Sequence, residues 1–262
     1  EGMREERITS RQNPLLRHAK KLLTSRSYRE ACGEFAADGT KLLEEAARWV
    51  PGLHTVIAAD DVEICRLPEE VRVVRVPRDV MASVSQMDAP QGAIFLCRTP
   101  QPPQAEILPG TLLLDGIQDP GNLGTIIRIA DWFGIGRGFC SPDSADCYNP
   151  KAVQATMGAL FRVSVGYGPL DSALAEAAVR GEAVYGTFLG GDDLYRAELS
   201  AGGIIVMGSE GRGISPQAAA LVNRKLFIPP FPSGRHGSES LNVAAATAIV
   251  CAEFRRRVRA AR

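Results

Sequence analysis

The chain has 262 residues, of which 45% are hydrophobic and 23% charged, a composition typical of globular proteins. Its 30 Lys and Arg balance 30 Asp and Glu, so no overall basic field points to a polyanionic partner. The six cysteines form no CxxC pair, which argues against a zinc site and a disulfide framework, and no apolar run approaches a membrane span. We therefore expect a metal-free cytoplasmic protein, although an organelle protein that has lost its leader would look the same.

The first hundred residues have the pattern of an α/β domain with its own core. Residues 11–23 form a basic amphipathic pattern, and the helix should begin near Asn13, which precedes a proline suited to a first helical turn. The elements expected after it are helices at 40–49 and 80–87 and strands at 54–58, 71–76 and 92–97.

A change in composition separates this region from the rest of the chain. Residues 99–109 contain four prolines, which favour an extended connector. We place a domain boundary near residue 105, which gives domains at 1–105 and 106–262.

Strands and helices alternate beyond the connector, which predicts a mostly parallel sheet covered on both faces. The expected strands are 111–114, 138–140, 163–165, 182–187, 204–207 and 225–228, and the expected helices are 123–133, 150–160, 171–179, 216–222 and 240–258. In such sheets, ligands bind at the carboxyl ends of the strands.

Three strand-to-helix junctions, at residues 112–133, 204–216 and 228–254, are rich in glycine and carry a few polar residues. Gly116, Gly121 and Gly124 do not have the spacing of a dinucleotide fingerprint, and no GK[ST] phosphate loop is present. His236 has no nucleophile elbow beside it, so a hydrolase triad is not expected. What remains is a ligand held mainly by backbone groups, which glycines allow to approach closely.

Two charged residues at these junctions have more than one interpretation. Glu210 is a candidate site residue, but it can also cap a neighbouring helix or pair with Arg212. Arg128 can pair with Asp131 on the surface or point back toward the glycine turn at Asn122. The residues alone leave both questions open.

The segments NLGTIIRIADWFGI, IIVMGSEGRGISP and ESLNVAAATAI resemble, in order and spacing, the three motifs of the SpoU (TrmH-like) branch of the SPOUT methyltransferases. The resemblance covers residues 112–254. It implies an α/β fold with a parallel sheet and a C-terminal trefoil knot, which general topology rules treat as a rare exception. It also implies a homodimer that binds S-adenosylmethionine and methylates RNA, most often at a ribose 2′-hydroxyl. The first domain is similar to the smaller α/β substrate-binding domains of such enzymes.

The resemblance assigns roles to individual residues. The positions that match the reaction site are Asn122, Arg128, Glu210, Ser240 and Asn242. The positions expected to bind the cofactor, largely through backbone groups, are Thr187, Leu189, Gly208, Ile228, Leu241 and Asn242. Arg128 would orient the hydroxyl, stabilise the developing alkoxide or hold the adjacent phosphate, because an arginine is a reluctant base.

Further expectations concern RNA and the partner subunit. The residues proposed to contact phosphates are Arg11, Arg17, Lys20, Lys21 and Arg26. Small residues of the last helix, Ala244, Ala245, Ala248 and Ala252, would permit a close dimer contact or pack inside the monomer. The loop at 229–238 is longer than expected and carries Arg235 and His236, which are either a surface excursion or a contact to RNA or cofactor.

Ribosomal RNA is the favoured substrate class. The alternatives are a transfer RNA 2′-O-methyltransferase and a non-catalytic RNA-binding protein on the same scaffold. Base methylation is disfavoured by the Ser240-Leu241-Asn242 motif.

Overall fold

The computed structural model describes residues 5–100, 107–234 and 237–260. It contains two compact units, one formed by the described part of Glu1–Gln101 together with Tyr148–Phe161, and the other by the described parts of Pro102–Cys147 and Arg162–Arg262. The boundary expected near residue 105 falls in 101–106, outside the described residues, and it stays a proposal about the functional domains.

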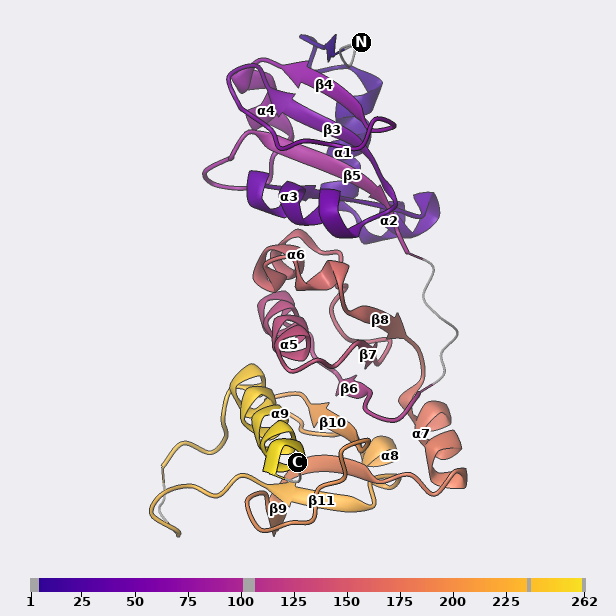
Figure 1. Cartoon of the computed structure of the whole chain (residues 1–262), viewed down its shortest axis with the longest axis vertical. Coiled ribbons are helices and arrows are strands. Elements are labelled where there is room, and N and C mark those ends of the chain that lie inside the picture. Colours follow the sequence, from indigo (N-terminus) through magenta and orange to yellow (C-terminus); the bar gives the residue numbers. More distant parts are fainter. Residues whose placement is uncertain (1–4, 101–106, 235–236, 261–262) are drawn as a thin grey trace. The chain divides into compact units, whose positions relative to one another are not determined.

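Unit 1 is built on a mixed sheet with the strand order β1-β4-β3-β5-β2, in which β5 runs antiparallel to β2 and β3. Strands β4, β3 and β5 lie side by side in Figure 1. Its elements are β1 (Glu6–Arg7), α1 (Pro14–Thr24), α2 (Arg26–Cys32), β2 (Glu34–Asp38), α3 (Thr40–Trp49), β3 (Leu53–Ala59), β4 (Arg72–Val76), α4 (Arg78–Val84), β5 (Ala93–Arg98), α6 (Pro150–Thr156) and the 3-10 helix η1 (Ala159–Phe161).

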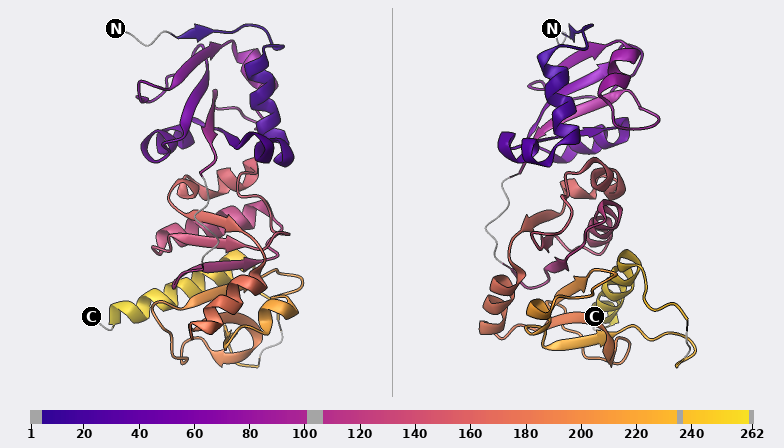
Figure 2. Two further views of the ribbon diagram at one scale, coloured as in Figure 1. Left: turned by 90° about the vertical axis from the view of Figure 1, so that its right-hand side faces the viewer. Right: turned by 180° about the vertical axis from the view of Figure 1, so that it is seen from behind.

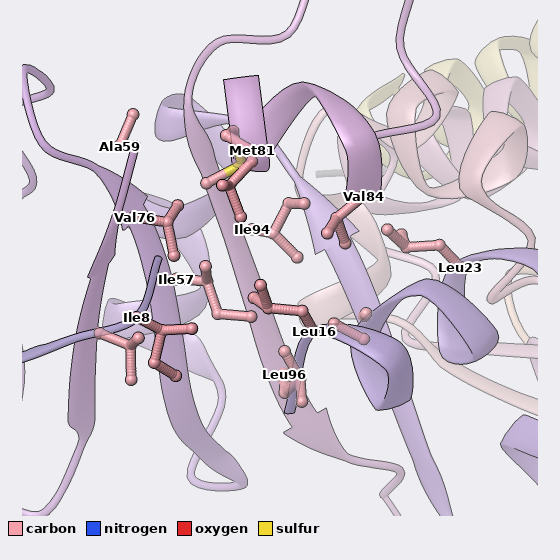
Figure 3. Packing of buried hydrophobic residues seen from close by; sticks show 14 of the residues in the cluster. Ile8, Leu16, Leu23, Ile57, Ala59, Val76, Met81, Val84, Ile94 and Leu96 are labelled. Atoms are coloured by element: carbon pink, nitrogen blue, oxygen red, sulfur yellow. The ribbon is translucent and has the colours of Figure 1, made fainter. Parts of the chain in front are cut away.

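The first helix begins where its sequence predicts. The Asn13 side chain accepts a hydrogen bond from Leu15 N at 2.9 Å, and Pro14 takes the first helical position. The apolar side of α1 packs with α4 onto one face of the sheet, where Leu16 lies among Ile57, Ile94 and other aliphatic side chains (Figure 3). The α/β pattern expected for the first hundred residues is therefore confirmed, and these residues form a hydrophobic cluster on this face of the sheet.

The other face of this sheet is covered by α3, α6 and η1. Phe35 stacks on Tyr148 with ring centroids 4.6 Å apart, and Phe161 lies 6.4 Å from both Phe35 and Phe95. Gln154 Nε2 donates to the Asp38 carbonyl. A short segment from the middle of the chain thus completes the core of unit 1.

Unit 2 contains a parallel sheet with the strand order β11-β9-β10-β6-β7-β8, as the alternation of strands and helices predicts. Helices α5 and α9 pack together on one face, and α7 and α8 lie on the other (Figures 1 and 2). The elements are β6 (Leu112–Asp115), α5 (Pro120–Trp132), β7 (Arg137–Cys140), β8 (Ser164–Tyr167), α7 (Leu170–Val179), β9 (Val184–Asp193), β10 (Ile204–Gly208), α8 (Pro216–Ala219), β11 (Arg224–Phe227) and α9 (Val243–Ala260).

Several predicted boundaries were wrong. The helix expected at 150–160 ends at Thr156, because Met157 and Gly158 take positive φ values of 50° and 90°. A β-carbon at Gly158 would lie 2.8 Å from Glu45 Cγ, so packing against α3 decides this break. The helix expected at 240–258 begins at Val243 instead, because Asn242 caps it.

The other differences have local causes. Helix α5 begins three residues earlier than expected, because Asp119 caps it and Pro120 occupies its first position. Among the other shifts, α4 covers Arg78–Val84 rather than 80–87, and α8 ends at Ala219 rather than 222. Elements α2 and β2 fill a region without a predicted element.

The strand expected at 182–187 continues to Asp193 and is irregular. Gly186 pairs with Lys225, whereas Asp192 pairs with the next residue of β11, Leu226. Residues 187–191 therefore bulge out of the ladder next to β11, and Gly191 permits the approach because its β-carbon would lie 2.7 Å from the Lys225 carbonyl oxygen.

Within the described ranges, no helix combines the length and apolar character needed to cross a membrane.

Candidate functional site

The site lies at the carboxyl edge of the unit 2 sheet. Strands β6, β9, β10 and β11 are parallel, so the segments that follow them emerge at the same edge. The three glycine-rich junctions follow β6, β10 and β11. Sequence reasoning therefore placed them correctly at one edge.

One carboxylate links the three junctions. Glu210 Oε1 accepts hydrogen bonds from Asn242 Nδ2 at 2.7 Å, from Val243 N at 2.9 Å and from Asn122 Nδ2 at 3.3 Å. Asn242 Nδ2 also donates to Asn122 Oδ1 at 2.9 Å. Three of the five predicted reaction-site residues thus form a single hydrogen-bonded cluster, although they lie up to 120 residues apart in the sequence.

The oxygen and the nitrogen of the Asn242 side-chain amide have different partners. Its Oδ1 accepts from Ala244 N at 2.9 Å and Ala245 N at 3.1 Å, which caps α9, while its Nδ2 faces Glu210 and Asn122. The Glu210 carboxylate lies at the same helix start, where the helix dipole favours a negative charge. The interpretation that Glu210 caps a neighbouring helix is therefore correct, and that role also places it in the site.

A tight turn presents Glu210. Ser209 N donates to the Gly213 carbonyl and Gly213 N to the Ser209 carbonyl, at 3.2 and 2.8 Å. Gly208 precedes the turn, and a β-carbon there would lie 2.3 Å from the backbone of Gly213, so only glycine fits. Because Ser215 N donates to the buried Asp115 carboxylate at 2.7 Å, the turn is also tied to the end of β6.

Arg128 and Ser240 are exposed and stand apart from this cluster. Within the described residues, neither side chain forms a hydrogen bond or ion pair. Asp131, the alternative partner of Arg128, is instead paired with Arg162 through Nη2 and Oδ2 at 3.0 Å. The Arg128 guanidinium is therefore available to a ligand.

The residues expected to bind the cofactor border the same edge. Thr187 and Leu189 lie in the bulge of β9, Gly208 ends β10, and Ile228 directly follows β11. The side chains of Leu189 and Leu241 are 79% and 49% exposed, so they offer uncovered apolar surface. The backbone groups of Ile228 and Leu241 form no hydrogen bonds with the described part of the chain. Apolar walls and free backbone groups suit a sulfonium nucleoside such as S-adenosylmethionine.

A cavity of about 230 Å³ opens beside the cluster. It shares Asn122, Glu210 and Val243 with the cluster and extends to a second set of residues, Gly116, Ile117, Gln118, Asp119, Ser209, Gly211 and Arg212. None of the residues predicted to bind the cofactor lines the cavity. Two of its lining residues, Ser209 and Val243, directly follow the cofactor positions Gly208 and Asn242. The edge therefore offers a space for a second reactant next to the expected cofactor positions.

Sequence reasoning missed Asp119, Asp115 and Arg212. Asp119 Oδ2 accepts from Asn122 N at 2.7 Å and so fixes the start of α5 that carries Asn122 and Arg128. Its signal was present in the sequence, because Asp followed by Pro is a typical helix start. Arg212 does not pair with Glu210 but lies near Asp143, and no local pattern predicts that pairing.

The five basic residues proposed for RNA are exposed in unit 1. Arg11 pairs with Asp79 and Arg26 with Glu30, both across surface distances of less than 3 Å. Arg17 and Lys20 form no ion pair with other described residues, and the Lys21 ammonium lies 5.3 Å from the ring centroid of Tyr28. Arg235 and His236 lie outside the described residues.

Sequence comparison matches both parts of the chain to families. The SpoU rRNA Methylase family model covers residues 109–252, more than half of the chain, and the MRM3-like substrate binding domain model covers residues 13–94. The 23S rRNA (guanosine(2553)-2′-O)-methyltransferase RlmP of Bacillus subtilis is 29% identical, with 95% of this chain and 99% of that protein aligned.

Solved structures agree with this match. A putative RNA methyltransferase of the TrmH family from Porphyromonas gingivalis is 39% identical and superposes with a TM-score of 0.83 over 92% of this chain and 97% of that one. An rRNA methyltransferase from Sinorhizobium meliloti with AdoMet bound is 26% identical, with a TM-score of 0.84 over 97% and 98% of the two chains. The cluster that joins the three junctions, the parallel sheet that carries it and these matches lead to one conclusion: the chain belongs to the SpoU rRNA methylase family.

Proposed function

We propose that the protein transfers the methyl group of S-adenosylmethionine to a ribose 2′-hydroxyl of ribosomal RNA. The observation that carries this function is the cluster of Asn122, Glu210 and Asn242, which assembles polar residues from all three motifs at the carboxyl edge of the sheet. The relative RlmP is a 2′-O-methyltransferase of 23S rRNA and aligns over almost its whole length, which favours ribosomal over transfer RNA.

The protein must align the hydroxyl with the methyl donor and assist loss of its proton. S-adenosylmethionine, when bound, supplies the methyl group as a sulfonium electrophile. The residues that would hold it are Thr187, Leu189, Gly208, Ile228, Leu241 and Asn242, the set at the ends of β9, β10 and β11 and the start of α9.

Arg128 is the residue proposed to act on the hydroxyl. A guanidinium has five donors and no acceptor, so it stabilises a developing alkoxide or holds a phosphate rather than accepting the proton. Its freedom from intramolecular partners in the described chain supports this role. The hydrogen bonds among Asn122, Glu210 and Asn242 would hold the three loops in fixed positions relative to one another. Ser240 would contact the reactants from the loop before α9.

The remaining proposals concern assembly. We infer a C-terminal trefoil knot and a homodimer, in which α5 and α9 form the subunit contact. Support for the dimer comes from exposed apolar residues on these two helices, because Trp132 is 84% exposed and Ala245 and Ala252 are also exposed. Ala244, by contrast, is buried within the monomer. A cytoplasmic location completes the proposal.

RNA recognition is assigned to the first domain. The substrate binding domain model ends at residue 94, and the SpoU rRNA Methylase model begins at residue 109. This gap supports a functional division near residue 105. Arg11, Arg17, Lys20, Lys21 and Arg26 are proposed to contact phosphates, so RNA affinity should fall steeply as salt rises. A salt-insensitive affinity would contradict this assignment.

The test is methyl transfer in vitro with labelled S-adenosylmethionine and unmodified ribosomal or transfer RNA. Label in nuclease-resistant dinucleotides of ribosomal RNA is the expected result. Label in transfer RNA, or in bases, would identify one of the alternative activities. Failure to bind S-adenosylmethionine in calorimetry would favour a non-catalytic RNA-binding protein.

Replacement of Arg128 tests the site. Arg128→Ala should lower the transfer rate by about 100-fold or more, the usual cost of a lost transition-state donor, while cofactor binding is retained. Arg196→Ala is the matched control, because Arg196 is 89% exposed in the same unit and lies outside the proposed site. Near-normal transfer by Arg128→Ala with RNA binding intact would rule out the assignment.

A further inference from the structure

The cavity beside the cluster of Asn122, Glu210 and Asn242 is lined by an arginine that has no role in the proposed reaction. Arg212 lines this cavity, and its side chain is 72% exposed. Its Nη2 would lie 3.9 Å from a β-carbon placed on Gly116, so the guanidinium extends over the glycine that follows β6. Arg212 is therefore directed into the cavity rather than away from it.

The backbone that carries Arg212 is fixed. Arg212 N donates to Ser209 Oγ at 3.1 Å, inside the turn closed by Ser209 and Gly213. Gly213 takes φ +69°, a conformation that side chains rarely adopt. Because the turn also holds Glu210, the position of Arg212 is set relative to the reaction site.

The guanidinium of Arg212 has only a weak ion pair with the described part of the chain. Its nearest carboxylate is Asp143, with 3.7 Å between Nη2 and Oδ2, which is longer than a hydrogen bond. The other oxygen of Asp143 accepts from Ser141 Oγ at 2.6 Å, and Ser141 Oγ accepts from Gly116 N at 2.8 Å. Asp143 thus lies near Arg212 but leaves most of its donors free.

Each of the two carboxylates that line the cavity directs one oxygen to donors of the protein. Glu210 Oε1 accepts three hydrogen bonds, and Asp119 Oδ2 accepts from Asn122 N. The positions assigned to the cofactor at Leu189, Ile228 and Leu241 do not line this cavity. An oxyanion that enters here is therefore more readily supplied by the RNA than by the cofactor.

We propose that Arg212 binds a backbone phosphate of the RNA beside the nucleotide that is methylated. This inference rests on the proposed function and adds to it the contact that sets the register of the ribose against Arg128. Arginine suits the task because its planar fork binds two phosphate oxygens at once. The cavity, at about 230 Å³, has room for one sugar-phosphate unit rather than a folded RNA element.

The experiment measures RNA binding and methyl transfer separately, with unmodified large-subunit ribosomal RNA transcribed in vitro. Arg212→Ala should weaken RNA binding and raise KM by about 10- to 100-fold, the range for hydrogen bonds to charged groups. The slope of log affinity against log salt should become shallower by about one phosphate contact. Arg212→Lys should recover part of the loss, because it keeps the charge but not the fork.

Two further variants separate binding from a structural role. Arg196→Ala, the exposed arginine control, should change neither the affinity nor the salt slope. Asp143→Asn should leave RNA affinity unchanged or raise it, because it removes the competing carboxylate. A loss with Asp143→Asn as large as that with Arg212→Ala would overturn the proposal, since it would show that the ion pair merely holds the turn.

The remaining outcomes are equally decisive. An unchanged salt slope in Arg212→Ala, or weaker binding of S-adenosylmethionine instead of RNA, would overturn the phosphate contact. If the wild-type protein methylates RNA but Arg212→Ala keeps its KM, only this inference fails. If the wild-type protein binds RNA with the Arg212-dependent slope but transfers no methyl group, the proposed function fails and the contact stands.

Discussion

Asn242 shows how one side chain serves both the helix and the site. Its oxygen caps α9, and its nitrogen donates to Glu210 and Asn122. An aspartate at this position would keep the cap but place a second carboxylate against Glu210. The two roles of Asn242 can therefore be separated by substitution.

Asn242→Asp should lose less stability than Asn242→Ala, because it keeps the cap and solvent screens part of its repulsion with Glu210 at this exposed position. Methyl transfer should fall in Asn242→Asp, because the donor to Glu210 and Asn122 is lost. Asn242→Ala should lose both, with a decrease in the free energy of unfolding of about 1 kcal/mol from the missing cap. Thermal unfolding and labelled methyl transfer, measured on the same preparations, check both effects. Equal stability losses in the two variants would contradict the separation.

Glu253 is a residue whose ionisation stabilises the fold. Hydrogen bonds from Arg256 and Arg257, at 2.8 and 2.6 Å, lower the pKa of this buried carboxyl to about 2. A lowered pKa means that the ionised form stabilises the folded state. This stabilisation is complete above pH 4.5, the ordinary value, and is lost as the pH falls toward 2.

Glu253→Gln should therefore be less stable than the wild-type protein at neutral pH, and the difference should shrink between pH 4.5 and 2. Thermal unfolding of both proteins at a series of pH values in this window gives the comparison. A stability gap that does not depend on pH would show that Glu253 contributes through packing instead.

At the scale of elements, α5 and α9 carry the proposed subunit contact. Trp132 ends α5 with most of its ring uncovered, and α9 adds the small residues Ala245 and Ala252 on its exposed side. Small side chains allow close helix approach, and a large aromatic supplies buried area, so the pair suits a helix-to-helix contact.

Trp132→Lys should convert the dimer to a monomer at micromolar concentration, as measured by sedimentation velocity, because it places a charge in an apolar contact. Val179→Lys is the matched control: Val179 is 89% exposed on α7, which covers the opposite face of the sheet. A Trp132→Lys protein that still sediments as a dimer would place the contact elsewhere.

At the scale of the whole molecule, the two compact units are not each continuous in sequence. Tyr148–Phe161 leaves the catalytic part of the chain and supplies α6 and η1 to unit 1. Phe161 packs near Phe35 and Phe95, on the face of the sheet opposite α1 and α4. The stability of unit 1 therefore depends on residues that follow its last strand, β5, by fifty positions or more.

Phe161→Ala should destabilise unit 1 by about 2 kcal/mol, less than a fully buried phenylalanine because the ring is half-buried. Hydrogen exchange should accelerate in β2 and β5, while β6 and β10 keep their protection. Phe231→Ala removes an equal side chain that is 91% exposed, so it should leave exchange unchanged. Faster exchange in β6 and β10 alone would contradict the assignment of Phe161 to unit 1.

The sequence by itself determined the elements and the edge of the sheet that carries the site. Helix starts at Asn13–Pro14 and Ser215–Pro216 were readable because capping and fixed proline φ are local effects. Alternating strands and helices predicted the parallel sheet, and such a sheet brings the glycine-rich junctions to one edge. The motif resemblance then supplied the residue set from Asn122 to Asn242.

The tertiary structure alone decided how these residues meet. Asn122 and Glu210 are 88 residues apart and Glu210 and Asn242 are 32 apart, so their contacts depend on strand order, which hydrophobic periodicity does not encode. The same holds for the break at Gly158 against Glu45, the bulge of β9 and the position of Arg212 near Asp143. In each case, a residue distant in sequence decides the local conformation or contact, because packing overrides local preference.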